Sequence, residues 1–288
     1  MANGDFHLHS NTSDGVLSPS EVIRSAAKNG VQHLALTDHD STEGLKEAAI
    51  AAEPLGLQLI CGIELSVVHL GTDIHILGYG FTQQFQPLQE YLQEQRDGRY
   101  RRMKKILNIL NEYGLAISED EILMIAGEGS IGRPHIARAL IAKGHVSSVQ
   151  EAFDKWLGDG KPADIQRQRL LPAEAISLIH EAEGLAFIAH PIFVGNDYEI
   201  AVHELALMGL DGIETYYKHY TDETIKKHQQ LGLKLSLISS GGSDYHGLGN
   251  PDDREIGDIP FPNTEIVTFL ESLERADLPG LSLARANK

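Results

Sequence analysis

The sequence has one cysteine, few aromatic residues and no long apolar run, and each shortage excludes a class of protein. Cys61 cannot form an internal disulfide, which favours a reducing compartment. Charge or glycine interrupts the apolar runs well before the roughly 18–20 residues that a membrane span needs. No basic segment followed by an apolar one opens the chain, so no secretory signal is visible. We expect a cytoplasmic protein that does not contact a membrane.

Basic residues are also scarce. The 288 residues include 24 Lys and Arg against 41 Asp and Glu, a formal net charge of −17. This balance argues against general coating of nucleic acid. The length allows one large domain, or one domain that carries an insertion. The unusual number is 14 histidines, which could reflect surface composition alone, so their positions must decide what they do.

Short apolar runs typical of strands alternate with amphipathic helical patterns along most of the chain. We predict helices at residues 19–29, 172–183 and 222–231. This alternation favours a parallel sheet, either closed into a barrel or doubly wound. The predicted strands cover residues 5–9, 34–38, 57–63, 74–79, 185–189, 212–215 and 234–239.

Residues 86–165 interrupt the alternation, because they show helical signals and no convincing strand. Met103, Ile106, Leu107 and Leu110 follow helical spacing, and further helices are predicted at 134–143 and 149–157. This segment has 11 basic and 12 acidic residues, whereas the other 208 residues have 13 and 29. We predict one domain from residues 1–85 and 166–288, with 86–165 as a helical insertion. The insertion is either an ordinary solvated segment or a lid over an anionic ligand.

Histidines and acids gather at the ends of the predicted strands. His7 and His9 are two residues apart, so in a strand both imidazoles point to one side. Each such residue alone could be a capping or loop residue, but together they indicate a metal site at the loop face of a (β/α) barrel. Imidazole and carboxylate without thiolate suit Mn²⁺, Fe²⁺ or Zn²⁺. The supply of ligands exceeds one closed four-coordinate site, so we predict two or three ions.

The motifs of this set are His7-x-His9, Ser13-Asp14-Gly15, Asp38-His39, Glu64, His75, Ala189-His190-Pro191 and Gly242-Ser243-Asp244-x-His246. In this combination they resemble the PHP (polymerase and histidinol phosphatase) family, which is related to the amidohydrolases. The resemblance covers residues 5–80 and 165–250. It implies an α/β fold, a distorted seven-stranded (β/α) barrel, with the all-helical segment as an insertion.

The resemblance also implies two or three divalent ions, with Mn²⁺ preferred and Fe²⁺ or Zn²⁺ as alternatives. It implies that Glu64 is shared between ions and that Glu64, Asp244 and His190 are catalytic. The implied ligand sets are His7, His9, Glu64 and Asp244 for one ion, Glu64, His75 and His190 for a second, and Asp14, His39 and His246 for a third.

The helical segment carries motifs of its own: Arg99-x-x-Arg102, Gly132-Arg133-Pro134-His135, Gly158-Asp159-Gly160-Lys161-Pro162, and Tyr216-Tyr217 with His219 outside it. They resemble a subgroup that removes the 3′-phosphate of 3′,5′-nucleoside bisphosphates. Some of its members are 5′→3′ exoribonucleases on short RNA. The resemblance implies substrate contacts from Arg99, Arg102, Arg133, His135, Lys161, Tyr217 and His219.

Charge supports this interpretation independently. Residues 96–105 hold six basic side chains against one acid, although a solvated helix face is the simpler alternative. Arg133 precedes Pro134 at a predicted helix start, where free N–H groups favour anions. Tyr217 follows a predicted strand, where it could stack on a base or simply pack.

We therefore predict a phosphomonoesterase that acts on a nucleotide by attack of a metal-bound hydroxide. His135, His219 or a metal-bound water could protonate the leaving 3′-oxygen. The alternatives are a 5′→3′ exoribonuclease on short 5′-phosphorylated RNA and a histidinol-phosphate phosphatase. An amidohydrolase is disfavoured, because no lysine ends a predicted strand. A non-enzymatic metal-stabilised module is the remaining class. No obligate protein partner is evident.

Overall fold

The computed structural model describes residues 2–127, 131–166, 169–195, 197–249 and 254–278. The chain forms two compact units. The barrel unit comprises Met1–Gln89 and Arg169–Lys288, and the helical unit comprises Glu90–Gln168. Helix α3 (Gln86–Glu112) begins in the first unit and continues into the second. Among the described residues, no helix is both long and apolar enough to cross a bilayer.

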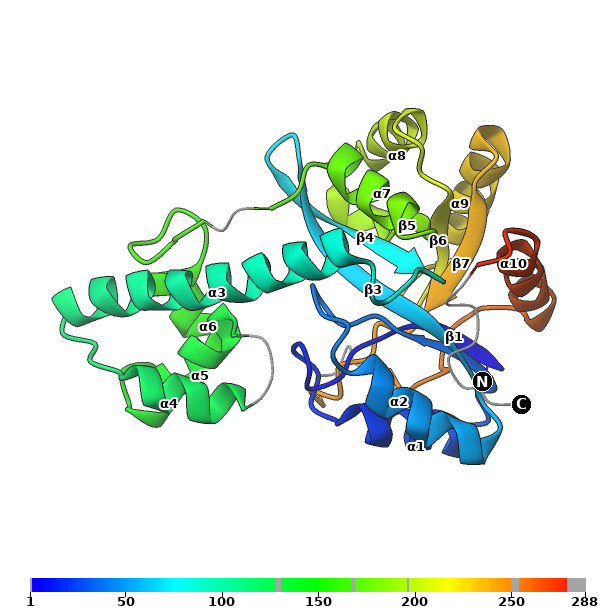
Figure 1. Cartoon of the computed structure of the whole chain (residues 1–288). Coiled ribbons are helices and arrows are strands. Elements are labelled where there is room, and N and C mark those ends of the chain that lie inside the picture. Colours follow the sequence, from blue (N-terminus) through cyan, green and yellow to red (C-terminus); the bar gives the residue numbers. More distant parts are fainter. Residues whose placement is uncertain (1, 128–130, 167–168, 196, 250–253, 279–288) are drawn as a thin grey trace. The chain divides into compact units, whose positions relative to one another are not determined.

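The barrel unit contains one seven-stranded sheet in which spatial order follows chain order, from β1 to β7. The first and last strands also meet, because the His9 N–H donates to the Tyr245 carbonyl at 3.0 Å. The sheet is thus a nearly closed barrel, and the predicted distorted seven-stranded barrel is confirmed (Figure 1). The strands are β1 Gly4–Leu8, β2 His33–Leu36, β3 Gln58–His69, β4 Thr72–Tyr79, β5 Leu185–Ile188, β6 Gly212–Tyr217 and β7 Ile238–Gly242.

The distortion is a reversal in the middle of the sheet. Strand β4 pairs antiparallel with both β3 and β5, whereas the other neighbours are parallel. Strands β3 and β4 form a long hairpin whose two-residue turn, Leu70–Gly71, has positive φ at both positions. The predicted strand at 57–63 was therefore too short, because β3 continues past Glu64 to His69.

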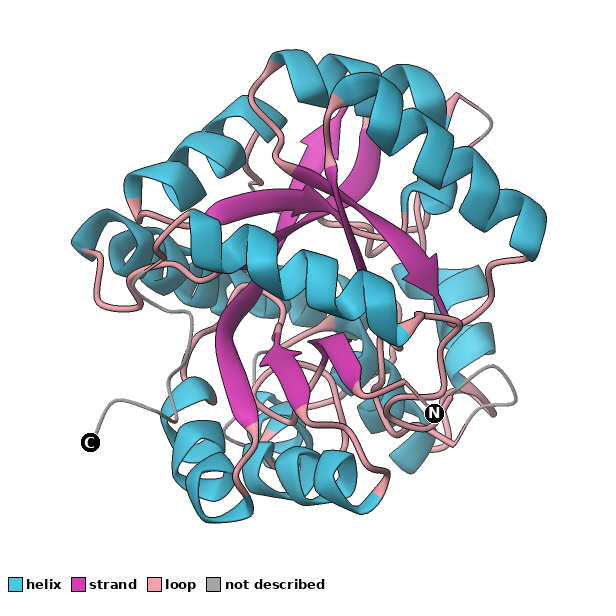
Figure 2. Cartoon of the chain, turned by 90° about the vertical axis from the view of Figure 1, so that its right-hand side faces the viewer, coloured by secondary structure: helices cyan, strands magenta, loops and turns pink. Residues whose placement is uncertain are grey.

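Helices lie outside the strands (Figure 2). Helix α1 begins with a capping box in which Ser18 and Glu21 bond each other's backbone N–H groups, and Pro19 follows the cap. The helices of the barrel unit are α1 Pro19–Lys28, α2 Leu45–Ala52, η1 Glu53–Leu55, α7 Pro172–Glu181, η3 Pro191–Val194, α8 Tyr198–Leu207, α9 Asp222–Leu235 and α10 Asn263–Arg275.

One predicted strand is placed differently. Residues 234–239 were predicted as a strand, but α9 runs through Leu235 and β7 begins only at Ile238. Ser236 ends the helix in the left-handed conformation, with φ of +58°. Leucines at alternate positions fit both the helical repeat and the strand repeat. The apolar pattern alone therefore could not locate where the helix ends and the strand begins.

Aromatic rings pack inside the barrel. The rings of Phe6 and Phe269 lie 4.5 Å apart and those of Tyr79 and Phe187 5.1 Å apart. All four side chains are fully buried, and the Tyr79 hydroxyl donates to the Phe6 carbonyl at 2.8 Å. This core fixes β1, β4 and β5, which carry predicted ligands.

The described part of the helical unit contains helices and no strand. Met103, Ile106, Leu107 and Leu110 are buried, so the helical stripe predicted from their spacing is correct. The helices after α3 are α4 Glu119–Ala126, α5 Arg133–Ala142, α6 Val149–Ala152 and the π-helical turn η2 Phe153–Leu157.

Candidate metal centre

Glu64 lies in the middle of β3 with its side chain fully buried, and five imidazoles surround its carboxylate. Burial of a single acid among polar rings is costly unless charge or metal compensates it. The five contacts to its oxygens are His39 Nδ1 at 3.0 Å, His7 Nε2 and His9 Nε2 each at 3.2 Å, His75 Nδ1 at 2.9 Å and His190 Nε2 at 3.3 Å.

Two further acids, Asp244 and Asp14, extend this cluster. Asp244 Oδ1 lies 3.2 Å from His9 Nε2 and 3.5 Å from His246 Nδ1. Asp14 Oδ1 lies 3.2 Å from His246 Nε2, and Asp14 Oδ2 lies 3.9 Å from His39 Nε2. His9 follows β1, and Asp244 and His246 follow β7, so these three residues come from opposite ends of the chain.

All nine predicted metal ligands thus lie together. Their atoms form four groups within which they lie no more than 4.8 Å apart. The groups overlap more than the predicted ligand sets, which share only Glu64, since His7, His9, His39 and Glu64 each belong to two groups. The groups are His9, Asp14, His39 and His246; His7, Glu64 and His190; His7, His9 and Asp244; and His39, Glu64 and His75.

The donor atoms fit divalent cations. Among the described residues, His7 Nε2, His39 Nδ1 and Glu64 Oε2 are buried without a hydrogen-bond partner of ordinary geometry. Buried polar atoms are normally satisfied, so such atoms converging on one point indicate a missing ligand. Imidazole nitrogen and carboxylate oxygen are borderline-to-hard donors that suit Mn²⁺, Fe²⁺ or Zn²⁺.

Mutual electrostatics hold the acids ionised. Burial acts to raise the pKa of Glu64, but the surrounding imidazoles, His39 and His7 foremost, hold that pKa well below its usual range. Burial likewise opposes ionisation of Asp244, and neighbouring histidines hold its pKa low too.

Glu214 of β6 is a buried acid that the sequence analysis missed. Its Oε1 lies 2.9 Å from His7 Nδ1, and its Oε2 accepts the His190 backbone N–H at 2.6 Å. Residue 190 has an unusual φ of +27°, and this hydrogen bond supports it. A carboxylate on the far nitrogen of a ligating imidazole fixes the ring's orientation and tautomer. The available signal was an acid inside the apolar strand at 212–215.

We expect the variant Glu214→Gln to bind Mn²⁺ about 10- to 100-fold more weakly, the usual cost of losing an outer-shell carboxylate. The amide cannot supply the negative charge that His7 faces, although it keeps the size of the side chain. Isothermal titration with Mn²⁺ measures the effect. The control is Glu204→Gln, which alters a half-exposed acid that pairs with His69 instead. Wild-type affinity in Glu214→Gln would remove the assigned role.

Tyr217 and Lys218 hold Asp244. The Tyr217 hydroxyl donates to Asp244 Oδ2 at 2.7 Å, and Lys218 Nζ donates to the Asp244 carbonyl at 2.9 Å. Asp244 has a φ of +49°, so these bonds support a conformation that is unfavourable for a non-glycine residue. Tyr217 is 2% exposed and belongs to β6, which ends later than predicted. The structure therefore places it behind a ligand, and its contact with substrate, like that of His219, stays a prediction.

Asp38 anchors the loop that carries Asp14. Its carboxylate accepts the Ser10 N–H and the Ser13 hydroxyl, each at 2.7 Å. The Asp38 side chain is buried, and these hydrogen bonds satisfy its carboxylate. Asp38 thus supports the cluster and does not belong to it.

In the helical unit, Arg133 is partly engaged. Its Nη1 donates to the Leu157 carbonyl at 2.9 Å and lies 3.4 Å from Asp159 and 3.9 Å from Asp164. His135 is buried at the start of α5, where its Nδ1 accepts the Gly132 N–H at 3.0 Å. That bond gives the imidazole a capping role.

The other predicted substrate contacts are placed on α3 and in a loop. The Arg102 guanidinium bonds the Ile165 carbonyl, and Arg99 lies on the same helix. Lys161 lies exposed in the loop after η2.

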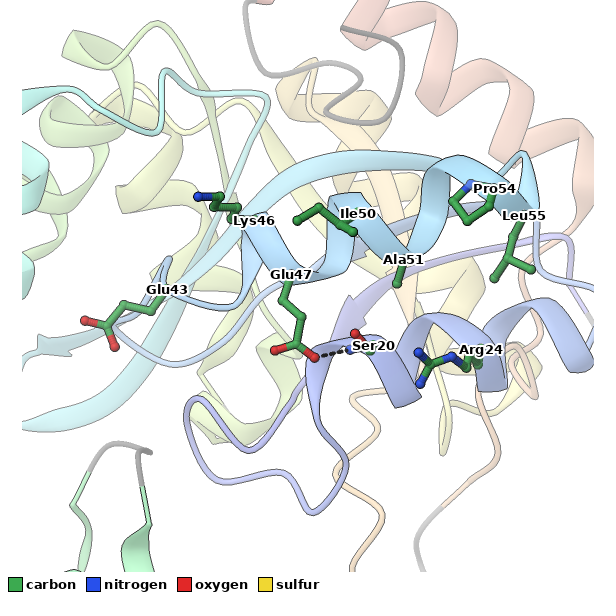
Figure 3. A pocket seen from close by; sticks show the side chains of 9 residues that line it. All are labelled: Ser20, Arg24, Glu43, Lys46, Glu47, Ile50, Ala51, Pro54 and Leu55. Carbon is green, nitrogen blue, oxygen red and sulfur yellow. Dashed lines mark hydrogen bonds between the residues drawn. The ribbon is translucent and has the colours of Figure 1, made fainter. Parts of the chain in front are cut away.

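Outside the cluster, a surface groove of about 560 Å³ lies between α1 and α2 (Figure 3). None of the residues that line it is a predicted site residue. They are Ser20, Arg24, Glu43, Lys46, Glu47, Ile50, Ala51, Pro54 and Leu55.

Known proteins resemble this chain over most of its length. A "5'-3' exoribonuclease" of Haemophilus influenzae is 36% identical over 245 residues, covering 84% of this chain and 89% of the relative. A "3',5'-nucleoside bisphosphate phosphatase" of Chromobacterium violaceum is 35% identical over 266 residues, covering 90% and 93%. A crystal structure described as a metal-dependent phosphoesterase, from Bifidobacterium adolescentis, is 27% identical with a TM-score of 0.81, covering 93% and 95%. The model of the PHP domain matches residues 5–165, and the chain belongs to the PHP domain family.

Proposed function

We propose that the chain is a metal-dependent phosphomonoesterase that removes the 3′-phosphate of 3′,5′-nucleoside bisphosphates. The observation that carries the proposal is the buried Glu64 carboxylate within 3.3 Å of five imidazoles. When bound, divalent ions supply Lewis acidity to phosphate oxygens and lower the pKa of water. The substrate follows from the relative of that name, which aligns over 90% of this chain.

Two or three ions, preferably Mn²⁺, would be held by the nine clustered residues, with Glu64 shared. We propose that His7, His190 and Glu64 hold one ion and that Asp14, His39 and His246 contribute to another. These side chains emerge from several strands of a rigid barrel, so the chain orients its donors before the substrate binds. We also propose a cytoplasmic setting.

The protein's own contribution is positioning and charge. Glu64 and Asp244 are ionised at neutral pH, and their negative charge offsets that of the cations. His190 is slightly more accessible than Glu64, with 12% against 0% of the side chain exposed. Phosphoryl transfer needs little covalent chemistry from the protein, so such preorganisation accounts for most of the acceleration.

We propose further that the basic side chains of the helical unit bind the non-reacting 5′-phosphate. Arg133→Ala then removes a charge-assisted contact and lowers kcat/KM for a 3′,5′-bisphosphate by about 10- to 150-fold. A nucleoside 3′-monophosphate has no 5′-phosphate, so its kcat/KM stays near the wild-type value. Steady-state kinetics on both substrates test this. Equal losses on the two substrates would show general damage and remove Arg133 from the 5′-phosphate site.

The matched control is Arg138→Ala, because Arg138 lies on the same helix, α5, and is exposed. It should leave both substrates unaffected. The variant Asp159→Asn tests the surroundings of Arg133 by removing a negative charge instead of a positive one. It removes an acid 3.4 Å from Arg133 Nη1 and should not weaken use of the bisphosphate.

A substrate panel at fixed Mn²⁺ tests the proposed function itself. The panel contains 3′,5′-bisphosphates, 3′- and 5′-monophosphates, histidinol phosphate and short 5′-phosphorylated RNA. We expect the 3′,5′-bisphosphate to give the highest kcat/KM, and a chelator to abolish turnover until Mn²⁺ is returned. Higher kcat/KM on RNA would favour the second candidate, a 5′→3′ exoribonuclease, which the Haemophilus relative's name supports. No turnover of any phosphate ester would indicate a non-enzymatic module.

A further inference from the structure

Phe193 is an exposed aromatic residue beside the metal centre. Its side chain is 58% exposed, although its neighbour Tyr217 is only 2% exposed. It belongs to the short turn η3, which begins directly after His190. An exposed phenyl ring forfeits the hydrophobic stabilisation that burial would give it. Single exposed apolar residues are common on protein surfaces, but this one follows directly after a predicted metal ligand, and its position is the informative feature.

The barrel holds the Phe193 ring in place. The ring lies 5.1 Å from the His190 ring at 58°, and 5.8 Å from the Tyr217 ring at 85°. The Phe193 N–H also donates to the His190 carbonyl at 3.0 Å. Edge-to-face contact with Tyr217 is a favourable aromatic geometry. These contacts hold one edge of the ring against the site and leave more than half of the side chain accessible.

The Phe193 ring also lies close to the cluster, next to the His190 ring. His190 Nε2 lies 3.3 Å from Glu64 Oε1, so the centre of the metal cluster and the Phe193 ring flank the same imidazole. In a nucleoside 3′-phosphate, only the ribose separates the phosphate from the base. A phosphate held at the cluster can therefore direct its base toward the Phe193 ring. Phe193 is the more accessible of the two rings, because the Tyr217 ring is buried and its hydroxyl is bonded to Asp244.

We infer that Phe193 stacks on the nucleobase of the substrate and so makes the site selective for nucleotides over other phosphate monoesters. This inference rests on the proposed function, since it assumes that the reacting phosphate binds at the Glu64 cluster. Aromatic stacking tolerates any base, because every base has a π-face. The selectivity is therefore for the presence of a base.

The test compares adenosine 3′,5′-bisphosphate with the same ribose bisphosphate lacking the base. Phe193→Ala should lower kcat/KM for the nucleotide by about 5- to 150-fold, the range seen when a stacking aromatic is removed. The abasic compound should react at the wild-type rate. Phe193→Trp should keep the preference for the nucleotide, and Phe193→Leu should lose it. Ile200→Ala, which truncates a side chain that is 60% exposed on α8, is the matched control.

Equal losses on both compounds would mean that Phe193 only supports His190, and unchanged kinetics would mean that it contacts nothing; either result overturns the inference. Equilibrium binding of adenosine 5′-monophosphate to the Mn²⁺-loaded protein separates this inference from the proposed function. Binding that weakens about 5- to 150-fold in Phe193→Ala supports stacking even if the wild type hydrolyses no bisphosphate. Binding unaffected by the substitution overturns stacking even if the bisphosphate is hydrolysed.

Discussion

The variant Glu64→Gln should lose at least about a thousandfold in kcat, because cations at a phosphoryl centre contribute several kcal/mol and each 1.4 kcal/mol is a factor of ten. A neutral amide cannot be shared between two cations as a carboxylate can. Removing the charge also leaves five imidazoles around an uncharged group. We expect metal content, measured on the purified variant, to fall together with activity.

Circular dichroism and thermal unfolding in chelator establish that the fold survives. Glu204→Gln is the matched control, since Glu204 also contacts an imidazole, that of His69, at 2.8 Å, and lies outside the cluster. Full metal content with a wild-type rate in Glu64→Gln would rule out the shared carboxylate. Full metal content without turnover would mean that Glu64 is needed for the reaction but not for metal binding.

The second large effect should come from Gly242→Ala, at the seam between β7 and β1. A Cβ atom at residue 242 would lie 2.2 Å from His7 Cβ and 2.5 Å from His7 N, so the two strands must separate. Overpacking typically costs about 1–3 kcal/mol, and a clash with backbone belongs at the upper end. At about 2–4 °C per kcal/mol, Tm should fall by roughly 6–12 °C. Displacement of His7 should weaken Mn²⁺ binding as well.

Gly232→Ala is the control for the size of the added group. Gly232 lies in α9, and a Cβ atom there would lie an ordinary 3.4 Å from the Leu237 carbonyl oxygen. Alanine favours helix over glycine, so Tm should stay constant or rise. Unchanged Tm in Gly242→Ala, measured by calorimetry, would contradict the close approach of the two strands.

The sequence predicted the barrel and the set of residues that lie together better than it predicted how the strands run. Histidines at alternate positions of one strand and acids after apolar runs are local patterns. They can be interpreted from the sequence without knowledge of the fold. Glu64 shows the limit of this reasoning. A charge normally ends a buried strand, so the predicted strand stopped just before Glu64. In the structure β3 continues five residues beyond Glu64. It can do so because the imidazoles of other strands compensate the carboxylate.

The missed features depend on contacts between distant residues. The antiparallel direction of β4 depends on pairing with β5, which is remote in the chain, as well as on the nearby turn at Leu70–Gly71. Glu214 was missed because its partners, His7 and His190, are remote in the chain. For Tyr217 the sequence left stacking on a base and packing both open, and β6 extends two residues beyond the predicted strand to include it.

The seam between β1 and β7 has a consequence for the order of folding. The Ser243 N–H donates to Asp5 across 238 positions of the sequence, a pairing of very high contact order. During synthesis the amino-terminal strand emerges first, and it must wait for nearly the whole chain before its last neighbour exists. His7 and His9 therefore acquire Asp244 and His246 as neighbours only late. Metal capture by the complete cluster must await the synthesis of residues 244–246, and refolding from denaturant should be limited by closure of this seam.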